Sequence, residues 1–178
     1  TGLSEDFQAT EIRLNTMQLH DVNLALQKPY TYLHWSQGAG KTVAGTAMGM
    51  YRLAKEQTQY VFVVSSAISI ETTWAPFLKL YGVRHRVIQH PRDFRRVYPG
   101  DFILLTLGRV NNHQKQMPRI VKIGCQKQLL IYDEAHNSSN LESSDAEGRL
   151  TKAVLSCFTR LKYKVLMSGT AISNNVVE

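Results

Sequence analysis

The residues with the clearest chemical potential form the stretch Ser36-Gln37-Gly38-Ala39-Gly40-Lys41-Thr42. A β-prone run precedes this stretch and a helix-compatible run follows it. Strand, glycine-rich turn, Lys-Thr and helix in this order are typical of a phosphate-binding P-loop, whose backbone N–H groups and helix N-terminus converge on an anion. We predict that Lys41 reaches the β- and γ-phosphates of a nucleotide and that the Thr42 hydroxyl binds Mg²⁺. The remaining predicted phosphate-binding residues are Gln37, Gly38, Ala39 and Gly40.

The loop departs from the full P-loop pattern at Trp35. That pattern has glycine five residues before Gly40, where this chain has tryptophan. The remaining Gly-x-Gly-Lys-Thr is moderately specific, so the prediction depends on what the rest of the chain supplies. Two places stay open for Trp35, one beneath the loop and one beside the nucleotide base.

A second motif, Asp133-Glu134-Ala135-His136, directly follows the apolar run Leu-Leu-Ile-Tyr. In P-loop sites an Asp at this position binds Mg²⁺, and the Glu orients the water that attacks the γ-phosphate. The alternative is an acidic helix cap after a strand, which the upstream P-loop disfavours. We therefore predict Lys41, Asp133 and Glu134 as catalytic residues, with Thr42 and Asp133 as the metal ligands.

Strand-like and helix-like patterns alternate along the chain, which predicts an α/β fold with a mostly parallel sheet and helices on both faces. In such a sheet the carboxyl ends of the strands meet at one edge, where the polar motifs would gather. Gly45 and Gly49 interrupt the helix after the P-loop and indicate close packing on the sheet. Segment 109–124 is open between a helix and a surface insertion. Strands are expected at 30–35, 60–65, 86–89, 101–107, 129–132 and 164–167, and helices at 14–26, 42–55, 69–81 (with Ser69 as N-cap) and 145–161.

The charge balance favours a polyanionic partner. The 178 residues include 21 Lys and Arg against 14 Asp and Glu, a formal charge of +7. Nucleic acid is the first candidate, and a solvated basic face is the equally weighted alternative. No apolar run approaches the roughly 20 residues of a membrane span, and no signal peptide is recognisable. We expect an intracellular protein, with its two cysteines as free thiols, and we expect the chain to be part of a larger protein.

Taken together, the Gly-Ala-Gly-Lys-Thr and Asp-Glu-Ala-His motifs resemble the first RecA-like lobe of superfamily 2 helicases. The closer resemblance is to Swi/Snf-type (Snf-like) DNA translocases, and it extends from about residue 12 to the end. Segment 14–23 resembles Leu-Arg-Pro-Tyr-Gln, and segment 67–74 resembles Pro-Ala-Ser-Leu-x-x-x-Trp. Segment 101–106 resembles the strand before a DNA-contacting loop. Segment 167–175, Met-Ser-Gly-Thr-Ala-Ile-Ser-Asn-Asn, resembles Leu-Thr-Gly-Thr-Pro-Ile-Gln-Asn-Asn and is the most specific match.

The resemblance implies roles for further residues. Gln18 would contact adenine, although a surface glutamine on a helix is commonplace. His136, Ser168, Gly169 and Thr170 would couple the ATP site to the nucleic acid. Ser69 and Thr106 would contact the nucleic acid, with a strand end as the equal alternative for Thr106. Trp74 is interpreted as a core anchor, and the basic cluster Arg92, Arg95 and Arg96 is open between flanking DNA and facing solvent.

The resemblance also implies a function. Residues 1–178 would form a single N-terminal RecA-like lobe that binds ATP and Mg²⁺, hydrolyses ATP and moves on double-stranded DNA. A second RecA-like lobe with an arginine finger would complete the site, so the isolated lobe would be weakly active. An RNA helicase, a restriction-enzyme motor subunit and a non-enzymatic nucleic-acid-binding module are the alternatives.

Overall fold

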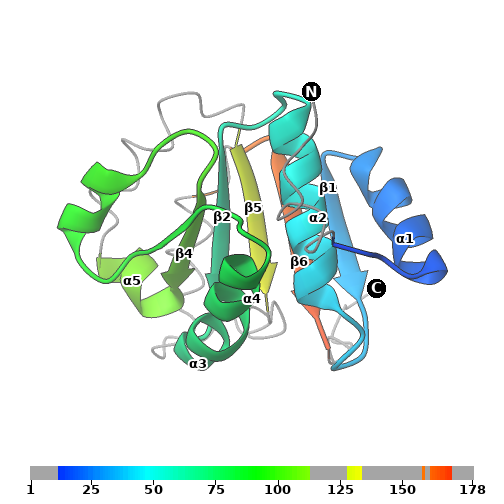
Figure 1. The fold of residues 1–178 in the computed structure, drawn as a ribbon, viewed down its shortest axis with the longest axis horizontal. Coiled ribbons are helices and arrows are strands. Elements are labelled where there is room, and N and C mark those ends of the chain that lie inside the picture. The colour runs from blue at the N-terminus through cyan, green and yellow to red at the C-terminus, as the bar shows by residue number, and fades with distance from the viewer. Residues whose placement is uncertain (1–11, 113–127, 134–157, 159–160, 170–178) are drawn as a thin grey trace, which may run out of the picture.

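A six-stranded sheet is the organising element of the fold (Figure 1), in a computed structural model that describes residues 12–112, 128–133, 158 and 161–169. The strand order is β1-β6-β5-β2-β4-β3, and every neighbouring pair is parallel. This confirms the predicted α/β fold with a parallel sheet. The strands are β1 (Tyr30–His34), β2 (Tyr60–Ser65), β3 (His85–Val87), β4 (Phe102–Thr106), β5 (Gln128–Asp133) and β6 (Tyr163–Ser168).

The apolar runs of the three central strands, β2, β4 and β5, become strands buried on both faces. β2, for example, has the sequence Tyr-Val-Phe-Val-Val-Ser, and its last five residues are all buried. Alternate side chains point to opposite faces, so Val61 and Val63 join one hydrophobic cluster and Phe62 and Val64 join another. Helices must therefore cover both faces of the sheet.

One face is covered by a single layer of three helical segments, which lie side by side in Figure 1. They are α1 (Thr16–Leu26), α2 (Lys41–Ala54) and the continuous segment of α3 (Ala67–Ser69), the π-helical turn η2 (Ile70–Trp74) and α4 (Ala75–Leu80). Each contributes buried side chains to the same cluster as Val61 and Val63. On the opposite face, Val110 of α5 (Leu107–Asn112) and the helical residue Phe158 pack with Phe62. The prediction of helices on both faces is confirmed.

The two glycines of α2 allow this helix to lie close to the sheet, as their presence predicts. A Cβ atom at Gly49 would lie 2.5 Å from Cζ of Phe102, and one at Gly45 would lie 3.0 Å from Cη2 of Trp74. Real Cβ atoms do not come as close as 2.5 Å to another atom, so only glycine fits at Gly49 without a shift of the Phe102 ring.

Arg52, near the end of α2, connects several elements at the amino-end edge of the sheet. Its side chain is 2% exposed and donates hydrogen bonds to the carbonyl oxygens of Leu26 and Lys28 and to Gln57. The guanidinium carbon also lies 3.9 Å from the ring centroid of Tyr163. Burial lowers the pKa of Arg52 from its ordinary value. The residue joins α1, α2 and β6 at the edge opposite the predicted site.

The largest differences from the sequence-based expectations concern the helix after β2 and strand β3, and other bounds shift by one or two residues. Ser66, not Ser69, is the N-cap of the helix after β2, because its hydroxyl accepts the backbone N–H of Ser69. A π-helical turn interrupts that helix, and β3 begins one residue earlier and ends two residues earlier than expected. The expected helix 145–161 and most of segment 109–124 lie outside the described residues. Within the described part of the chain, no helix is long and apolar enough to cross a membrane.

Candidate nucleotide and magnesium site

The turn between β1 and α2 has the backbone of an anion-binding loop. Gly38 and Gly40 have φ values of 79° and 88°, in the left-handed region that side chains other than glycine rarely adopt. Gly40 is the N-cap of α2 and has no side chain to cap the helix. The free backbone N–H groups and the positive end of the dipole of this 14-residue helix therefore meet at the loop.

Lys41 lies over the loop that it follows. Its Nζ atom donates hydrogen bonds to the carbonyl oxygens of Trp35 at 3.1 Å and Ser36 at 3.4 Å. A Cβ atom at Gly169 would lie 3.0 Å from the same Nζ and 3.5 Å from the backbone nitrogen of Gln37. The residue that follows β6 thus contacts the loop that follows β1, and glycine there leaves room for the lysine.

Gln18 reaches the same loop from α1. Its Nε2 donates to the carbonyl oxygen of Ala39 at 2.7 Å, while its Oε1 accepts the backbone N–H of Asn15 at 3.0 Å. The Asn15 side chain in turn accepts the Gln18 N–H, which completes a capping box at the start of α1. Gln18 therefore joins α1 to the P-loop, next to Gly40.

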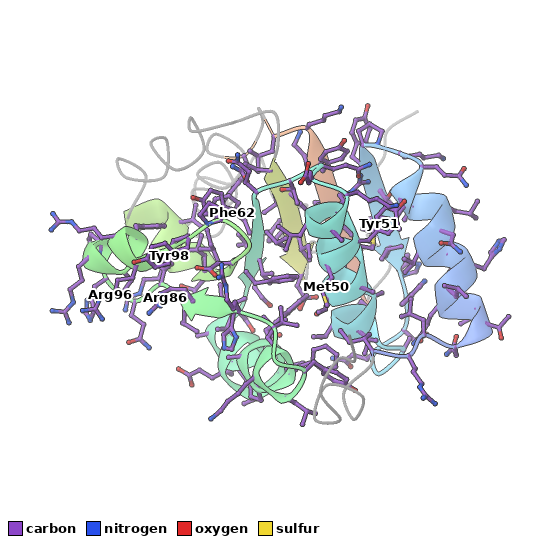
Figure 2. The ribbon with its side chains drawn as sticks, turned by 45° about the horizontal axis from the view of Figure 1, so that its top comes forward. Met50, Tyr51, Phe62, Arg86, Arg96 and Tyr98 are labelled. Atoms are coloured by element: carbon purple, nitrogen blue, oxygen red, sulfur yellow. The ribbon has the colours of Figure 1, made fainter. Side chains whose placement is uncertain are left out.

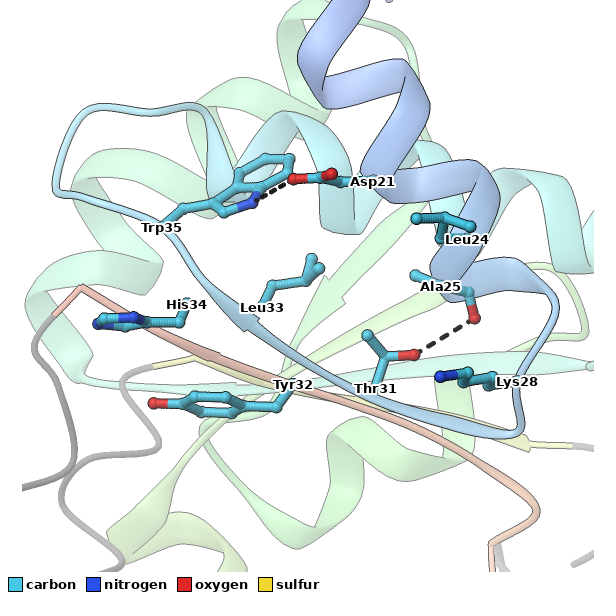
Figure 3. Close-up of a pocket in the computed structure, with 9 residues that line it drawn as sticks. All are labelled: Asp21, Leu24, Ala25, Lys28, Thr31, Tyr32, Leu33, His34 and Trp35. Atoms are coloured by element: carbon cyan, nitrogen blue, oxygen red, sulfur yellow. Dashed lines mark hydrogen bonds between the residues drawn. The ribbon is translucent and has the colours of Figure 1, made fainter. Parts of the chain in front are cut away.

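Trp35 is nearly buried at the end of β1, and its indole contacts α1. Its side chain is 8% exposed and belongs to the cluster that contains Leu33. The indole Nε1 donates to Oδ2 of Asp21 at 3.0 Å, and Figure 3 shows this bond beside the pocket of about 320 Å³ between α1 and β1. On the other side of β1, Figure 3 shows Tyr32 and His34. Trp35 thus packs between α1 and the start of the loop.

Asp133 ends β5 in a nearly buried position, with 7% of its surface exposed. Its Oδ2 atom accepts hydrogen bonds from Nε1 of Trp74 at 2.9 Å, from the hydroxyl of Ser65 at 3.2 Å and from the hydroxyl of Ser69 at 3.4 Å. All three donors belong to β2 and the helical segment that follows it. They satisfy and orient a carboxylate that would otherwise be costly to bury.

The sheet order brings the candidate groups together. β1, β6 and β5 are neighbours, so the P-loop, Ser168-Gly169 and Asp133 follow three adjacent strand ends at one edge. The backbone N–H of Trp35 donates to the Ser168 carbonyl oxygen at 3.2 Å, which fixes this alignment. At about 4.8 Å per strand, β1 and β5 are about 10 Å apart. A nucleotide phosphate and its metal fit this separation.

The chemistry of these groups suits a magnesium–nucleotide complex. Mg²⁺ is held in such sites by one or two carboxylates, a hydroxyl and substrate phosphates, and Asp133 and Thr42 supply the first two kinds of group. No group of three or more His, Cys, Asp or Glu that would make an all-protein metal cage occurs among the described residues. Gly38 opens onto space, since a Cβ atom there would meet nothing within 4 Å.

Other predicted site residues are only partly covered by the structure. Glu134, His136 and Thr170 lie outside the described residues. Ser69 does not cap its helix, and its hydroxyl contacts Asp133. Thr106 ends β4, and its hydroxyl accepts the backbone N–H of Arg109 at 3.2 Å. Thr106 therefore forms the end of a strand, as one of its two interpretations has it. Contacts of Ser69 and Thr106 with nucleic acid remain predictions.

The basic cluster lies at the β3 edge of the sheet. Arg92, Arg95 and Arg96 are exposed on the short 3-10 helix η3 (Pro91–Arg96), and Figure 2 shows Arg86, Arg96 and Tyr98 on this flank. Asp93 accepts the backbone N–H groups of His90 and Gln89, and these bonds hold the pKa of Asp93 below its ordinary value. Among the described residues, the salt bridge is Arg84–Asp101. The three arginines of η3 have no carboxylate partner within 4 Å in that part of the chain.

Sequence reasoning missed the donors around Asp133. It placed Trp74 in the core, where the side chain is fully buried, but gave no role to its indole N–H. Ser65 is the last residue of a predicted strand, and its position beside the end of β5 follows only from the strand order. The Trp35–Asp21 bond was also missed, because it joins an ordinary helix-surface aspartate to the strand.

Comparison with known proteins gives one family and a set of similar folds. The family described as type III restriction enzyme, res subunit, matches residues 7–173. No curated protein matches the chain. Among solved structures, the Sulfolobus solfataricus SWI2/SNF2 ATPase core in complex with dsDNA superposes with a TM-score of 0.73 at 19% identity. That superposition covers 92% of this chain and 33% of the other.

Two further structures share the fold. A nuclease-deletion mutant of the type ISP restriction-modification enzyme LlaGI, in complex with a DNA substrate mimic, has a TM-score of 0.63 at 14% identity, over 89% of this chain and 17% of that one. The UvsW helicase from bacteriophage T4 has a TM-score of 0.62 at 16% identity, over 88% and 52%. The chain therefore spans between about a sixth and a half of these proteins. At these identities the likeness shows a shared helicase-core fold of the RecA-like type.

Proposed function

Since this chain belongs to the family of the type III restriction enzyme res subunit, we propose that it is the ATP-binding motor lobe of an ATP-dependent DNA translocase. The lobe would hydrolyse ATP to move the protein on double-stranded DNA. The observation that carries the proposal is the convergence of the P-loop, Gly169 and Asp133 at three adjacent strand ends.

The residues of the P-loop would bind and orient the phosphates of ATP. The N–H of Ala39 donates to the carbonyl oxygen of Ser36 at 3.1 Å. The other backbone N–H groups of residues 37–42 and the N-terminus of α2 would offer hydrogen bonds and a positive potential to these phosphates. Lys41 would exchange its contacts with the carbonyl oxygens of Trp35 and Ser36 for the β- and γ-phosphates. Such an exchange replaces neutral acceptors with charged ones, which make stronger hydrogen bonds.

Asp133 and Thr42 would hold Mg²⁺, and Glu134 would orient the attacking water. When bound, the metal neutralises charge that develops on the phosphates. Asp133 is suited to this task because Trp74, Ser65 and Ser69 already fix its carboxylate. Gln18 would contact the adenine base, and its position beside Gly40 supports that role. His136, Ser168, Gly169 and Thr170 would couple this site to the nucleic acid.

The proposed partners are double-stranded DNA and a second RecA-like lobe of the same protein. The formal charge of +7 favours nucleic acid, and the candidate contacts at Ser69 and Thr106 follow β2 and β4 at the same edge as the nucleotide site. The structures of the SWI2/SNF2 core and the LlaGI mutant contain DNA or a DNA mimic. The chain spans a third or less of those two proteins, which supports a further lobe that supplies an arginine finger.

A restriction-enzyme motor subunit is the second candidate for the whole protein. The observation that favours it is the description of the matching family. Both candidates predict DNA-dependent ATP hydrolysis, and they differ in what the movement drives. A nuclease assay on circular DNA with the intact protein and its partners separates them, since a restriction motor supports cleavage and a remodelling translocase does not.

The proposed chemistry is tested by Glu134→Gln and Lys41→Ala in the intact protein. Glu134→Gln should retain ATP binding and abolish DNA-dependent hydrolysis, because the amide cannot activate water. Lys41→Ala should lose hydrolysis and bind ATP about 100-fold more weakly, because the phosphates lose their cation. Phosphate release and equilibrium binding of ATP give the two readouts. Normal hydrolysis by Glu134→Gln would contradict the mechanism.

A further inference from the structure

The buried indole of Trp74 contacts the carboxylate of Asp133 and so belongs to the surroundings of the candidate metal ligand. Trp74 is fully buried, and its Nε1 donates to Oδ2 of Asp133 at 2.9 Å, a shorter distance than those from the hydroxyls of Ser65 and Ser69. The edge of the indole also faces α2, where a Cβ atom at Gly45 would lie 3.0 Å from Cη2. Trp74 therefore lies between the helix that starts at the P-loop and the carboxylate at the end of β5.

The π-helical turn explains how Trp74 and Ser69 reach the same oxygen. The two residues are five positions apart, and in an α-helix such positions point about 140° away from each other. In a π-helical turn, residue i bonds to residue i+5, so the two positions lie one turn apart on one face. The backbone N–H of Ala75 donates to the carbonyl oxygen of Ile70 within this five-residue turn. The π-helical turn therefore directs the side chains of Ser69 and Trp74 to the same atom of Asp133, although residues at this spacing point apart in an α-helix.

We propose that Trp74 is a positioning residue for the magnesium-binding carboxylate, and that the π-helical turn at residues 70–74 exists to aim Trp74 and Ser69 together at Asp133. This inference rests on the proposed function for the role of Asp133. Trp74 does not touch the substrate. It holds the rotation of the Asp133 carboxylate, as groups behind metal ligands do in other proteins.

The first test compares nucleotide affinity with Mg²⁺ and with EDTA. Trp74→Phe keeps the aromatic ring and removes the N–H donor. It should weaken binding of a fluorescent ADP analogue about tenfold in Mg²⁺ and leave the affinity in EDTA unchanged, because the loss acts through the metal ligand. Leu78→Val, one turn further along and also fully buried, is the control for core damage and should retain both affinities. Equal losses in Mg²⁺ and EDTA, or no loss in either, would overturn the proposal.

The second test alters the turn and keeps both side chains. An alanine inserted after the exposed Thr73 puts Ser69 and Trp74 six positions apart, a spacing that points about 120° apart in an α-helix. The insertion should reproduce the Mg²⁺-specific loss, whereas Thr73→Ala should bind as the unaltered protein does. If the insertion variant keeps its full Mg²⁺ dependence, or loses affinity equally in EDTA, the turn has no aiming role.

A third measurement needs no nucleotide and so separates this inference from the proposed function. The chain has two tryptophans, and Trp35→Phe assigns the indole N–H resonance of Trp74 by elimination. Asp133→Ala should shift that resonance and speed its exchange with solvent, because the carboxylate acceptor is gone. An unchanged resonance would refute the hydrogen bond. A shifted resonance in a protein that binds no nucleotide would leave the contact intact and refute the proposed function.

Discussion

At the residue scale, Gly40 shows how the loop depends on a contact from another element. A Cβ atom at Gly40 would clash with Nε2 of Gln18, the atom that donates to the Ala39 carbonyl oxygen. Gly38 has a similar positive φ, yet its Cβ position is open. Substitutions at these two glycines can therefore be compared to separate the cost of a left-handed backbone from the cost of displacing Gln18.

We predict that Gly40→Ala destabilises the protein more than Gly38→Ala. Both variants pay about 1–2 kcal/mol for a left-handed residue with a side chain. Gly40→Ala should cost about 1 kcal/mol more, because the displaced Gln18 amide loses its hydrogen bond. Urea unfolding measures the difference, and in a Gln18→Ala background it should vanish. Equal destabilisation of both single variants would show that the Gln18 contact contributes nothing.

The same scale shows what the sequence could and could not predict about the site. The P-loop residues and Asp133 follow from local patterns, because glycine spacing and a carboxylate after an apolar strand are properties of neighbours in sequence. The place of Trp35 could not be chosen, since it depends on Asp21 of a separate helix. Ser69 was wrongly taken as an N-cap because Ser66, three residues earlier, offers the same hydroxyl.

At the element scale, α2 joins the nucleotide site to the sheet through its glycines. The approach of α2 is closest at Gly49, where Phe102 and Val61 lie beneath the backbone. Glycine costs a helix about 1 kcal/mol relative to alanine. Its presence twice in α2 is thus explained by packing and not by helix formation.

Gly49→Ala should therefore destabilise the protein although alanine favours a helix. Overpacking costs about 1–3 kcal/mol and exceeds the gain of about 1 kcal/mol in helix propensity. Gly108→Ala in α5 is the matched control, because a Cβ atom there meets nothing within 4 Å. It should leave stability unchanged or raise it by up to about 1 kcal/mol. Thermal unfolding of both variants gives the signs, and stabilisation by Gly49→Ala would contradict the close approach.

Element bounds were predictable where burial dominates the pattern. The expected and observed bounds of β2 coincide, since a continuous apolar run leaves no choice of face or end. β3 was misplaced because its half-buried His-Arg-Val has no such run. The π-helical turn at 70–74 leaves no mark in hydrophobic spacing, and the contacts of Ser69 and Trp74 with Asp133 join residues about 60 positions apart, so neither could be predicted.

At the scale of the whole molecule, the order of strands is the feature that no local pattern reveals. β1 pairs with β6, so Tyr30 lies opposite Lys164, although 134 residues separate the two in sequence. The parallel sheet could be predicted from the alternation of elements, and its order could not. That order nevertheless sets the site, because it places the P-loop beside Gly169 and Asp133.

The basic cluster at the β3 edge gives a prediction for the whole surface. Arg95→Ala with Arg96→Ala should lower the salt dependence of DNA binding by about two ion equivalents, if each arginine contacts one phosphate. Lys55→Ala with Lys79→Ala removes the same charge at the ends of α2 and α4, at the amino-end edge of the sheet, and should leave the slope unchanged. Affinities at several salt concentrations measure both. Equal slopes for the two double variants would favour a solvated basic face.

The most direct measurement of the central claim is equilibrium binding of ATP with Mg²⁺ to this chain and to its Lys41→Ala variant. The account predicts Mg²⁺-dependent binding that weakens by about 100-fold in Lys41→Ala, because a charged hydrogen bond to phosphate is worth about 1.5–3 kcal/mol. Asp133→Asn should lose the Mg²⁺ dependence while the affinity in EDTA persists. Equal ATP affinity in the unaltered chain and in Lys41→Ala would contradict a nucleotide site at this loop.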